Sequence, residues 1–384
     1  MELYIHIPFC VKKCEYCSFV SFQASEIQKK EYIDAVLREA EIRKDECTEA
    51  VTTVFIGGGT PSLLSPDLLA YLIEGIRKQM LILPDAEFTM EANPGTVSET
   101  LLREAGSLGV NRLSFGIQAR QERLLNLLGR IHTWPDAVHA VEAACKAGIR
   151  NINLDLIFGI PGQTIREWEE TIRAAVSLQP CHISAYGLIP EEGTPLYRKL
   201  ADHEYQLPDP DTEREMYDLA IRVLASSGFH QYEISNFSLD GCECLHNIGY
   251  WTQIPYIGLG VSAASMLLSQ EPASGMRYLR KKNPDSLRGY LSMIREQDFS
   301  AASVEEVCGR EARFETMMLA LRMNRGIREE RFRQMHGVSL DACYGTRLRE
   351  MEQQGLTQYE GGAWSLTRRG FDIQNSILLE LMEE

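Results

Sequence analysis

Short apolar runs rich in β-branched residues alternate with longer stretches of helical periodicity along the first half of the chain. The runs predict six strands, at residues 2–7, 51–56, 87–92, 112–116, 151–158 and 182–188. The stretches between them predict helices at residues 28–45, 66–79, 98–107, 134–147 and 165–178. Strands that alternate with helices form parallel sheets through right-handed crossovers. We therefore expect an α/β fold, a partial (β/α)6 TIM-like barrel, in preference to a doubly wound open sheet.

The pattern changes beyond about residue 300, where charged segments of helical period predominate. Helical segments at residues 311–324, 329–334 and 340–354 precede a turn and a short strand-like run at residues 363–366. Helices followed by a turn and a small hairpin are typical of a winged-helix-like module. We expect three parts: a barrel over residues 1–230, a connecting segment over residues 231–300, and a mostly helical, winged-helix-like C-terminal domain over residues 301–384.

Composition and charge narrow the class of protein. Of the 384 residues, 44% are hydrophobic and 24% are charged, the balance of a globular protein with a full-sized core. The net charge of −15 disfavours binding to nucleic acid, and it allows at most peripheral contact with an anionic membrane. The first strand and the first cysteine fall within the first ten residues of the sequence, so we expect no signal peptide. Ten cysteines in such a chain fit a reducing compartment, so we expect a cytoplasmic protein.

Three cysteines with the spacing C-x3-C-x2-C, namely Cys10, Cys14 and Cys17, directly follow the first predicted strand. Three thiolates on one short loop can bind three irons of a [4Fe-4S] cluster and leave the fourth iron open. An electron-transfer ferredoxin closes its cluster with a fourth thiolate, so the triplet indicates chemistry at the exposed iron. A structural zinc site is the alternative, but it needs a fourth ligand near the loop. The next cysteine is Cys47, and the nearby His6 lies within a strand.

Glycine and polar residues stand at or near the ends of the other predicted strands. A glycine run at residues 57–61 follows the second strand, Glu91 ends the third, and the polar stretch at residues 114–118 lies on the fourth. Asp155 lies between apolar neighbours on the fifth strand, where a carboxylate is costly unless it is paired. Arg130 is a cation available for a ligand carboxylate, although an exposed position fits it equally. Since ligands gather where parallel barrel strands end, we expect a binding site there, with a structural hydrogen bond as the alternative for Asp155.

The cysteine triplet, the glycine run and residues 153–162 together resemble the radical S-adenosylmethionine (SAM) enzymes. Within that superfamily, residues 4–10 and 157–164 are similar to the oxygen-independent coproporphyrinogen III oxidase branch. The resemblance implies a [4Fe-4S] cluster whose open iron binds SAM, and reductive cleavage of SAM to a 5′-deoxyadenosyl radical. It also implies a flavodoxin- or ferredoxin-like electron donor and a C-terminal domain that caps the barrel mouth.

The resemblance further implies cofactor roles for particular side chains. Gly58, Gly59 and Thr60 match positions that contact the methionyl part of SAM, and Gln118 and Asp155 match positions that bind ribose hydroxyls. The remaining matches are Arg130 for a carboxylate, Glu91 for an amino or hydroxyl group, Tyr4 near the cluster, Tyr16 near adenine and Ala185 for a backbone contact. Two SAM molecules share this set in the oxidase, and we assume one here.

Two departures from the oxidase count against decarboxylation of coproporphyrinogen. The oxidase has a cysteine two residues after its third ligand, where this chain has Phe19. It also has a long N-terminal arm before the triplet, whereas Cys10 is the tenth residue of this sequence. We therefore expect a different activity.

A second motif, H-N-x-x-Y-W, spans His246, Asn247, Tyr250 and Trp251 and resembles the heme-chaperone branch called HemW. A neutral imidazole at His246 can bind heme iron, the rings of Tyr250 and Trp251 can pack against the macrocycle, and Asn247 can orient the ligand by hydrogen bonding. Cys244 is a second candidate for the axial ligand. The alternative is that these side chains only fill a gap between domains.

Two functions remain open from the sequence. The first is a radical SAM heme chaperone that binds a [4Fe-4S] cluster, SAM and heme, and that delivers heme to a client hemoprotein such as a respiratory cytochrome. The second is a radical enzyme that acts on a porphyrin or porphyrinogen, including a methyltransferase. Phe19 and the H-N-x-x-Y-W motif favour the first, and the sequence leaves open whether the chain is an enzyme.

Overall fold

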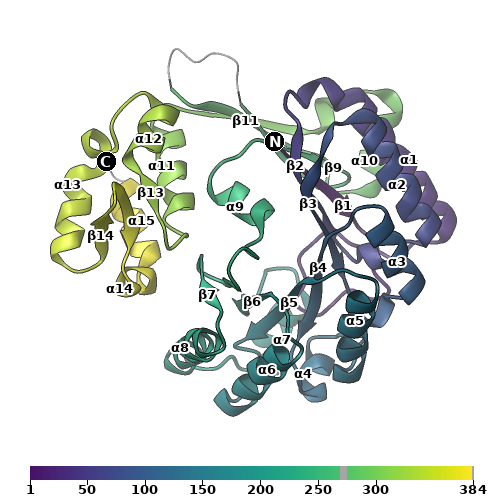
Figure 1. The fold of residues 1–384 in the computed structure, drawn as a ribbon, viewed down its shortest axis with the longest axis horizontal. Helices are drawn as coiled ribbons and strands as arrows, with labels where there is room; N and C mark the ends of the chain where they lie inside the picture. The colour runs from purple at the N-terminus through teal and green to yellow at the C-terminus, as the bar shows by residue number, and fades with distance from the viewer. Residues whose placement is uncertain (269–274, 383–384) are drawn as a thin grey trace.

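The computed structural model describes residues 1–268 and 275–382. In this part of the chain a twelve-stranded sheet has the order β12-β11-β10-β9-β1-β2-β3-β4-β5-β6-β8-β7, and it curves as Figure 1 shows. Six consecutive strands are parallel neighbours: β1 (Glu2–Ile7), β2 (Val51–Gly58), β3 (Ile82–Ala92), β4 (Arg112–Gln118), β5 (Asn151–Phe158) and β6 (His182–Gly187). The predicted partial barrel is confirmed.

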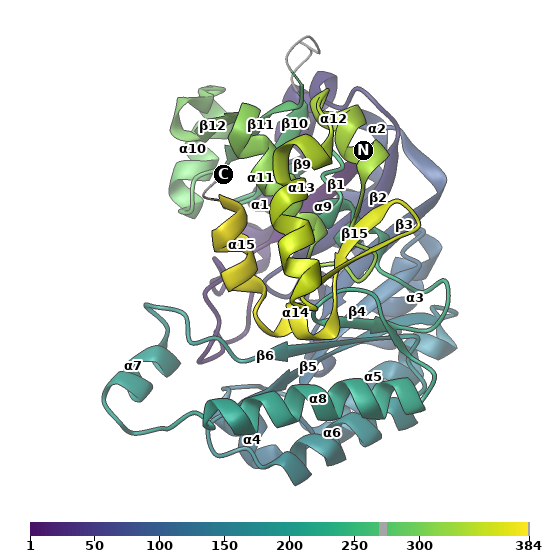
Figure 2. The ribbon, with the colours of Figure 1, turned by 90° about the vertical axis from the view of Figure 1, so that its left-hand side faces the viewer.

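Helices cover the outer face of the parallel strands (Figures 1 and 2). They are α1 (Glu26–Arg43), α2 (Pro66–Gln79), α3 (Glu99–Ser107), α5 (Trp134–Lys146), α6 (Ile165–Ser177) and α8 (Pro210–Ser226). The short helices α4 (Glu122–Leu127) and α7 (Pro195–Ala201) instead share a small apolar cluster of their own. Several helices begin where a Ser or Thr side chain accepts a hydrogen bond from the first turn, as Ser65 does from Leu68. These caps explain why the helix starts could be predicted closely from the sequence.

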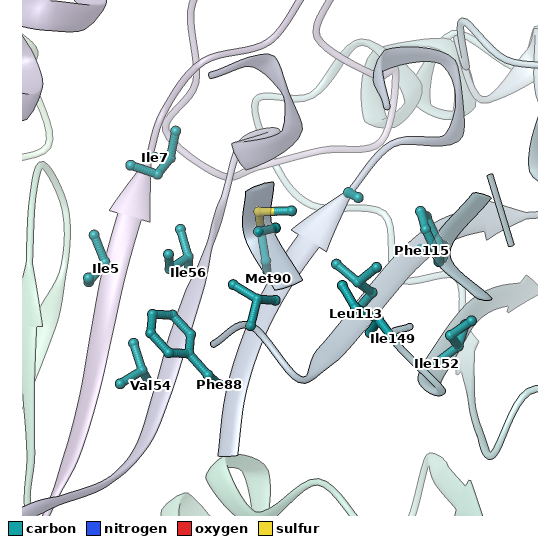
Figure 3. Packing of buried hydrophobic residues seen from close by; sticks show 14 of the residues in the cluster. Ile5, Ile7, Val54, Ile56, Phe88, Met90, Leu113, Phe115, Ile149 and Ile152 are labelled. Carbon is teal, nitrogen blue, oxygen red and sulfur yellow. The ribbon is translucent and has the colours of Figure 1, made fainter. Parts of the chain in front are cut away.

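Successive side chains along each strand point alternately to the core under the helices and to the interior of the barrel. On β1, Leu3, Ile5 and Ile7 are buried against the helices, and Figure 3 shows this packing for several strands. The neighbours Tyr4 and His6 point to the other face and line cavities inside the barrel. The polar positions of these strands therefore meet inside the barrel.

The segment over residues 231–300, expected to be a connection, extends both ends of the barrel sheet. Its elements are β8 (Asn236–Ser238), α9 (Leu245–Trp251), β9 (Tyr256–Leu259), β10 (Ala264–Leu268), β11 (Arg277–Lys282) and α10 (Leu287–Glu296), with β7 (His230–Gln231) before them and β12 (Ser303–Cys308) after them. β9 pairs in parallel with β1 because its apolar residues Ile257 and Leu259 complete the core there. The domain boundaries at residues 230 and 300 stay a prediction.

The C-terminal domain has its own core and packs beside the barrel (Figure 2). It contains α11 (Gly309–Ala320), α12 (Glu329–His336), α13 (Leu340–Gln353), α14 (Arg368–Asp372) and α15 (Gln374–Met382), with the strands β13 (Ile327–Arg328), β14 (Thr357–Glu360) and β15 (Ala363–Leu366). The helices with this small antiparallel sheet match the expected winged-helix-like arrangement. Arg368 on α14 forms an ion pair with Asp218 on α8, which ties the domain to the barrel edge.

Candidate functional site

The cysteine loop lies between β1 and α1, and backbone hydrogen bonds close it. The Cys10 N–H donates to the Phe22 carbonyl at 3.0 Å, and the Phe22 N–H donates to the Pro8 carbonyl at 2.8 Å. Within the loop the Cys17 N–H donates to the Cys14 carbonyl at 3.3 Å. All three thiols are half-buried, and burial raises the pKa of Cys17.

Positive charge and a hydroxyl group lie next to the thiols. The Arg130 guanidinium donates from Nη1 to Cys14 Sγ at 3.4 Å and from Nη2 to the Gly116 carbonyl. The Thr60 Oγ1 lies 3.6 Å from Cys10 Sγ. A cation beside a sulfur atom stabilises the thiolate, the form that binds iron. The loop therefore suits thiolate ligands, with Arg130 held against one of them.

The described residues contain no group of three His, Cys, Asp or Glu side chains close enough to hold a single metal ion. The ligands of a four-iron cube need no such closeness, because each thiolate binds a different iron. The free thiols, the cation and the closed loop therefore fit a cluster with three protein ligands.

The glycines after β2 have a packing reason as well as an expected cofactor role. A Cβ on Gly59 would lie 2.8 Å from the carbonyl oxygens of Ile7 and Phe9, so no side chain fits between this loop and the end of β1. Gly58 has a φ of +109°, and its N–H donates to Glu91 Oε2 at 3.0 Å. A side chain at Gly59 would displace the backbone that leads into Cys10, whereas one at Gly58 would meet the His6 ring, 2.4 Å from the added Cβ.

A polar cavity fills the barrel interior. It encloses about 150 Å³ and is lined by residues from most of the parallel strands and from α9: Tyr4, Phe55, Glu91, Arg112, Ser114, Asn153, Asp155, His182, Ser184, Tyr186, Asn236, Cys244, His246, Asn247 and Tyr250. We call it the polar cavity. Three of the predicted cofactor residues and three residues of the H-N-x-x-Y-W motif therefore share one space.

Two of the predicted cofactor residues are acids of the polar cavity with raised pKa values. Burial and the nearby charge of Asp155 raise the pKa of Glu91 from 4.5 to about 7. Burial also raises the pKa of Asp155, whose Oδ2 and Oδ1 accept hydrogen bonds from Ser114 Oγ at 3.0 Å and Asn153 Nδ2 at 2.8 Å. Enclosed carboxyl groups of this kind favour a ligand that brings positive charge or hydrogen-bond donors.

Gln118 ends β4, and Tyr4 lies within β1. Gln118 has a φ of +61°, and its buried Oε1 has no hydrogen-bond partner among the described residues. An unsatisfied buried acceptor of this kind is uncommon and fits a ligand hydroxyl. The Tyr4 hydroxyl is within 3.0 Å of His6 Nδ1, and His6 Nε2 is within 3.0 Å of the Val20 carbonyl just after the cysteine loop.

Tyr16 and Ala185 pack in apolar surroundings and line neither cavity. Tyr16 packs against the small apolar cluster that includes Leu128, and burial raises its pKa. Ala185 faces the helix side of β6, and its N–H already donates to the Ser235 carbonyl at 2.8 Å. Only the backbone at Ala185 can therefore reach a ligand inside the barrel.

The H-N-x-x-Y-W motif forms α9, which lies between the barrel and the C-terminal domain (Figure 1). Glu87 on β3 accepts hydrogen bonds from the first α9 amides, Leu245 N at 2.9 Å and His246 N at 3.0 Å, and from Cys244 Sγ at 3.6 Å. A carboxylate at a helix N-terminus satisfies amides that lack partners in the helix. Glu87 therefore fixes α9 to the sheet.

His246 does not have the free imidazole nitrogen that the sequence led us to expect. Its side chain is 2% exposed, with Nδ1 at 2.7 Å from Thr53 Oγ1 and Nε2 at 2.9 Å from the Tyr250 hydroxyl. Burial and the charge of Arg112 lower its pKa to about 3, so the ring is neutral. In this arrangement the ring orients Tyr250 and stacks on Phe55 at 5.2 Å.

The other motif residues are divided between the cavities and the domain interface. Asn247 and Tyr250 line the polar cavity, whereas Trp251 lies outside it with the Arg322 guanidinium 4.9 Å above its ring. Burial raises the pKa of Cys244 to about 12, so its thiol is neutral at physiological pH. The motif residues therefore line a cavity on one side of α9 and contact the C-terminal domain on the other.

Glu2 and His246 lie 3.9 Å apart at the base of the barrel without forming an ion pair at neutral pH. Burial raises the pKa of Glu2 from 4.5 to about 9, so the carboxyl is protonated where the imidazole is neutral. Glu2 Oε2 has no partner among the described residues, and a Cβ on Gly249 of α9 would lie 1.8 Å from Glu2 Oε1. The neutral carboxyl thus packs directly under α9.

We expect the thermal midpoint of the protein to fall as pH rises from 7 to 9, and the fall to be smaller in Glu2→Gln. The folded state keeps the Glu2 proton up to about pH 9, whereas the unfolded chain has released it. The folded state then binds more protons, so the free energy of unfolding decreases with pH. Thermal unfolding at pH 7, 8 and 9 measures this, with exposed Glu74→Gln as the control. Equal slopes in the two glutamate variants would contradict the prediction.

Several residues of the barrel interior were not predicted from the sequence. Arg112, His182 and Asn153 line the polar cavity, but their positions read as strand interior, where polar residues carry no obvious signal. Burial by itself would lower the pKa of the Arg112 guanidinium, but the neighbouring Cys244 and Glu87 outweigh burial and raise this pKa above its ordinary value. The group is therefore a cation. Arg112 and Ser114 are two residues apart on β4, so the alternation of side chains along a strand could have placed both on the face toward the barrel interior.

Comparisons with known proteins agree with this geometry. The pattern of the Radical SAM superfamily matches residues 4–175, and the HemN C-terminal domain matches residues 309–373. The solved structure of coproporphyrinogen III oxidase (HemN) from Escherichia coli aligns with 99% of this chain and 89% of its own, with a TM-score of 0.82 at 21% identity. The fold and the cysteine loop thus define a radical SAM protein with a HemN-type C-terminal domain.

Curated relatives give the family within that class. "Heme chaperone HemW" of Bacillus subtilis (strain 168) is 36% identical over 377 residues, which cover 97% of each chain. "Heme chaperone HemW" of Lactococcus lactis subsp. lactis (strain IL1403) is 33% identical over 375 residues, covering 97% of this chain and 95% of its own. The chain belongs to the HemW family of radical SAM proteins, a family that implies a [4Fe-4S] cluster and SAM as cofactors. Within residues 1–268 and 275–382, no helix combines the length and the apolar character needed to cross a membrane.

Proposed function

We propose that this protein binds heme beside its cofactor site and delivers it to client hemoproteins. The observation that carries the proposal is the position of α9, whose Tyr250 lines both the polar cavity and a second, larger cavity. The relatives named heme chaperones cover nearly the whole chain, which supports the same function. A respiratory cytochrome is the client class we propose, and the ten free cysteines, all within the described residues, fit a cytoplasmic location.

The larger cavity has the size and the walls that a tetrapyrrole needs. It encloses about 440 Å³, within the range of about 300–1,000 Å³ that small-molecule sites occupy, whereas the polar cavity is smaller than that range. It is lined by Tyr4, His6, Ser18, Phe19, Val20, Tyr250, Tyr256, Ser262, Ala264, Lys282 and Asp285. We call it the aromatic cavity, because four rings of Phe and Tyr face it and suit a flat conjugated ligand.

Phe19 links the sequence departure to this cavity. It stands where the oxidase branch has a cysteine, and its side chain is 65% exposed although it is large and apolar. An exposed aromatic ring beside a cavity gains contacts when a ligand covers it. The same residue that argues against decarboxylation therefore contributes a wall for heme.

The cofactor residues keep the roles expected from the resemblance. Cys10, Cys14 and Cys17 would hold the cluster, which supplies the electron for SAM chemistry when it is bound. Glu91 and Asp155 would receive the amino and hydroxyl groups of SAM, with Gln118 completing the ribose contacts. A flavodoxin- or ferredoxin-like protein is the electron donor we propose.

The motif residues are assigned by what they face. Tyr250 and Asn247 would contact the bound ligand, and His246 would act through Tyr250, which its Nε2 atom holds at 2.9 Å. Trp251 lies toward the C-terminal domain and would couple heme binding to that interface. A ligand bond from His246 to iron would require the Tyr250 hydrogen bond to break.

We expect Phe19→Ala to weaken heme binding about tenfold, because an aromatic side chain contributes contact area and ring stacking worth roughly 1–2 kcal/mol. Hemin titration of the anaerobically reconstituted protein, followed by absorption, measures the affinity. Ile189→Ala is the matched control, since Ile189 is 71% exposed and does not line the aromatic cavity. Iron and sulfide content should be unchanged in both variants.

The same preparation separates heme delivery from the enzymatic alternative. We expect stoichiometric heme binding by the wild-type protein and no release of carbon dioxide from coproporphyrinogen. Turnover of coproporphyrinogen without heme binding would overturn the proposed function in favour of a porphyrinogen-modifying enzyme.

A further inference from the structure

Arg112 is a buried cation whose charge is offset only at a distance, by acids such as Glu87 and Asp155, and not by a direct contact among the described residues. It begins β4 inside the barrel, is 2% exposed and lines the polar cavity. Within residues 1–268 and 275–382 its side chain makes no hydrogen bond and no ion pair, and its Nε atom is fully enclosed. A buried charge is costly unless a counter-charge and hydrogen bonds satisfy it. The described residues therefore leave the hydrogen-bond donors of this guanidinium unused.

Two of the carboxylates near Arg112, Glu87 and Asp155, are committed to other donors, and the third, Glu91, accepts from the Gly58 N–H through Oε2 and forms no ion pair with Arg112. Both Glu87 oxygens accept hydrogen bonds from the start of α9, at 2.9 Å and 3.0 Å. Both Asp155 oxygens accept hydrogen bonds from Ser114 and Asn153. Asn153 Oδ1 in turn accepts from His182 Nδ1 and Ser184 Oγ. The polar residues around Arg112 therefore satisfy one another and leave the guanidinium facing the cavity.

Asn247 supplies a second unsatisfied donor on the same cavity. Its buried Nδ2 has no hydrogen-bond partner among the described residues, and Asn247 lines the polar cavity together with Arg112. One donor comes from β4 and the other from α9, so the two approach the space from different elements. Two enclosed donors, one of them charged, call for an anionic acceptor with more than one oxygen.

We propose that Arg112 and Asn247 form a subsite for a carboxylate of the ligand that occupies the barrel. A carboxylate matches the planar guanidinium fork, and the cavity of about 150 Å³ has room for a carboxylate arm but not for a whole tetrapyrrole. Tyr4 and Tyr250 line both cavities, so an arm of a ligand in the aromatic cavity reaches the polar cavity beside these two rings. The proposal rests on the proposed function where the carboxylate is a heme propionate.

Two ligands of this site carry the required group, heme through its propionates and SAM through its methionyl carboxylate. The test therefore uses four probes: hemin, hemin dimethyl ester, SAM and decarboxylated SAM. Arg112→Gln should lower the affinity for the probe that uses the subsite by at least about tenfold, because removing one partner of a buried charge pair is strongly unfavourable. The matching probe without the carboxylate should bind Arg112→Gln and wild type equally.

Stability of the ligand-free protein distinguishes a subsite from a structural charge. Arg43 is the matched control, since it is 5% exposed but fully partnered, with Glu39 at 3.0 Å and Glu46 at 2.8 Å. Arg43→Gln should lower the thermal midpoint by several degrees and leave probe affinity unchanged. Arg112→Gln should lower the midpoint less than Arg43→Gln does, because Arg112 has no direct hydrogen bond or ion pair to lose among the described residues. Asn247→Ala should weaken the same probe by a smaller factor.

Each outcome decides the proposal. If the Arg112→Gln variant loses affinity for only one of hemin and SAM, the result supports the subsite and identifies its ligand. Unchanged affinity for both, or a midpoint that falls as far as in Arg43→Gln, overturns it. If the wild-type protein binds no heme, the proposed function fails, while the SAM probes still test the subsite.

Discussion

Glu87→Ala is expected to release α9 and to abolish heme binding while the cluster stays in place. The substitution leaves the Leu245 and His246 amides without their acceptor at the start of the helix. Each buried N–H that loses its partner costs about 1–3 kcal/mol, so the loss of two partners should lower the free energy of unfolding by roughly 2–6 kcal/mol. Tyr250, which lies on α9, would then no longer form the wall shared by the two cavities.

Thermal unfolding, hemin titration and iron analysis of the same preparation test this expectation. Asp85→Ala is the matched control, because Asp85 lies two residues earlier on β3 and is exposed. Glu87→Gln keeps one acceptor oxygen and should fall between the control and the alanine variant. Heme affinity that survives in Glu87→Ala would show that α9 does not build the heme site.

Cys14→Ala is expected to remove the cluster completely and SAM binding with it. Two remaining thiolates cannot anchor a cube that already lacks a fourth protein ligand. The substitution also removes the sulfur that accepts the Arg130 Nη1 hydrogen bond, which leaves a cation at the edge of the site. Iron and sulfide per chain should therefore both fall to zero, with no partly assembled cluster left.

Cys145→Ala is the control for this prediction, since Cys145 is half-buried on α5, away from the cysteine loop. Iron, sulfide and the electron paramagnetic resonance spectrum of the reduced protein measure the cluster after anaerobic reconstitution. A full complement of iron in Cys14→Ala would refute the assignment of the loop. Retained iron together with lost SAM binding would instead place Cys14 at the SAM site.

The sequence predicted the parallel barrel closely because local signals agree there. The strand at residues 151–158 and the helix at residues 66–79 coincide with β5 and α2, where apolar runs and a serine cap mark the ends. The role of β9 could not be predicted, because its pairing with β1 depends on residues distant in sequence. Short strands such as β9 are decided by tertiary packing rather than by local preference.

The residues of the candidate site also fall into those that the sequence could predict and those that it could not. The cysteine loop, the glycine run and Asp155 were found because their residue types are unusual at those positions. The commitment of both His246 nitrogens and the isolation of Arg112 follow from neighbours that no local pattern reveals. Hydrogen-bond partners across the barrel depend on register, which is set by the whole sheet.

The position of β1 in the middle of the sheet has a consequence for how the protein matures. The strand that carries the cysteine loop is flanked on one side by β2 and on the other by β9, and Glu2 pairs with Tyr256. During synthesis one edge of β1 therefore stays bare until most of the chain has left the ribosome. Before that point the strand that carries the metal-binding loop has only one of its two neighbouring strands, so we expect the cube to assemble after β9 has been translated.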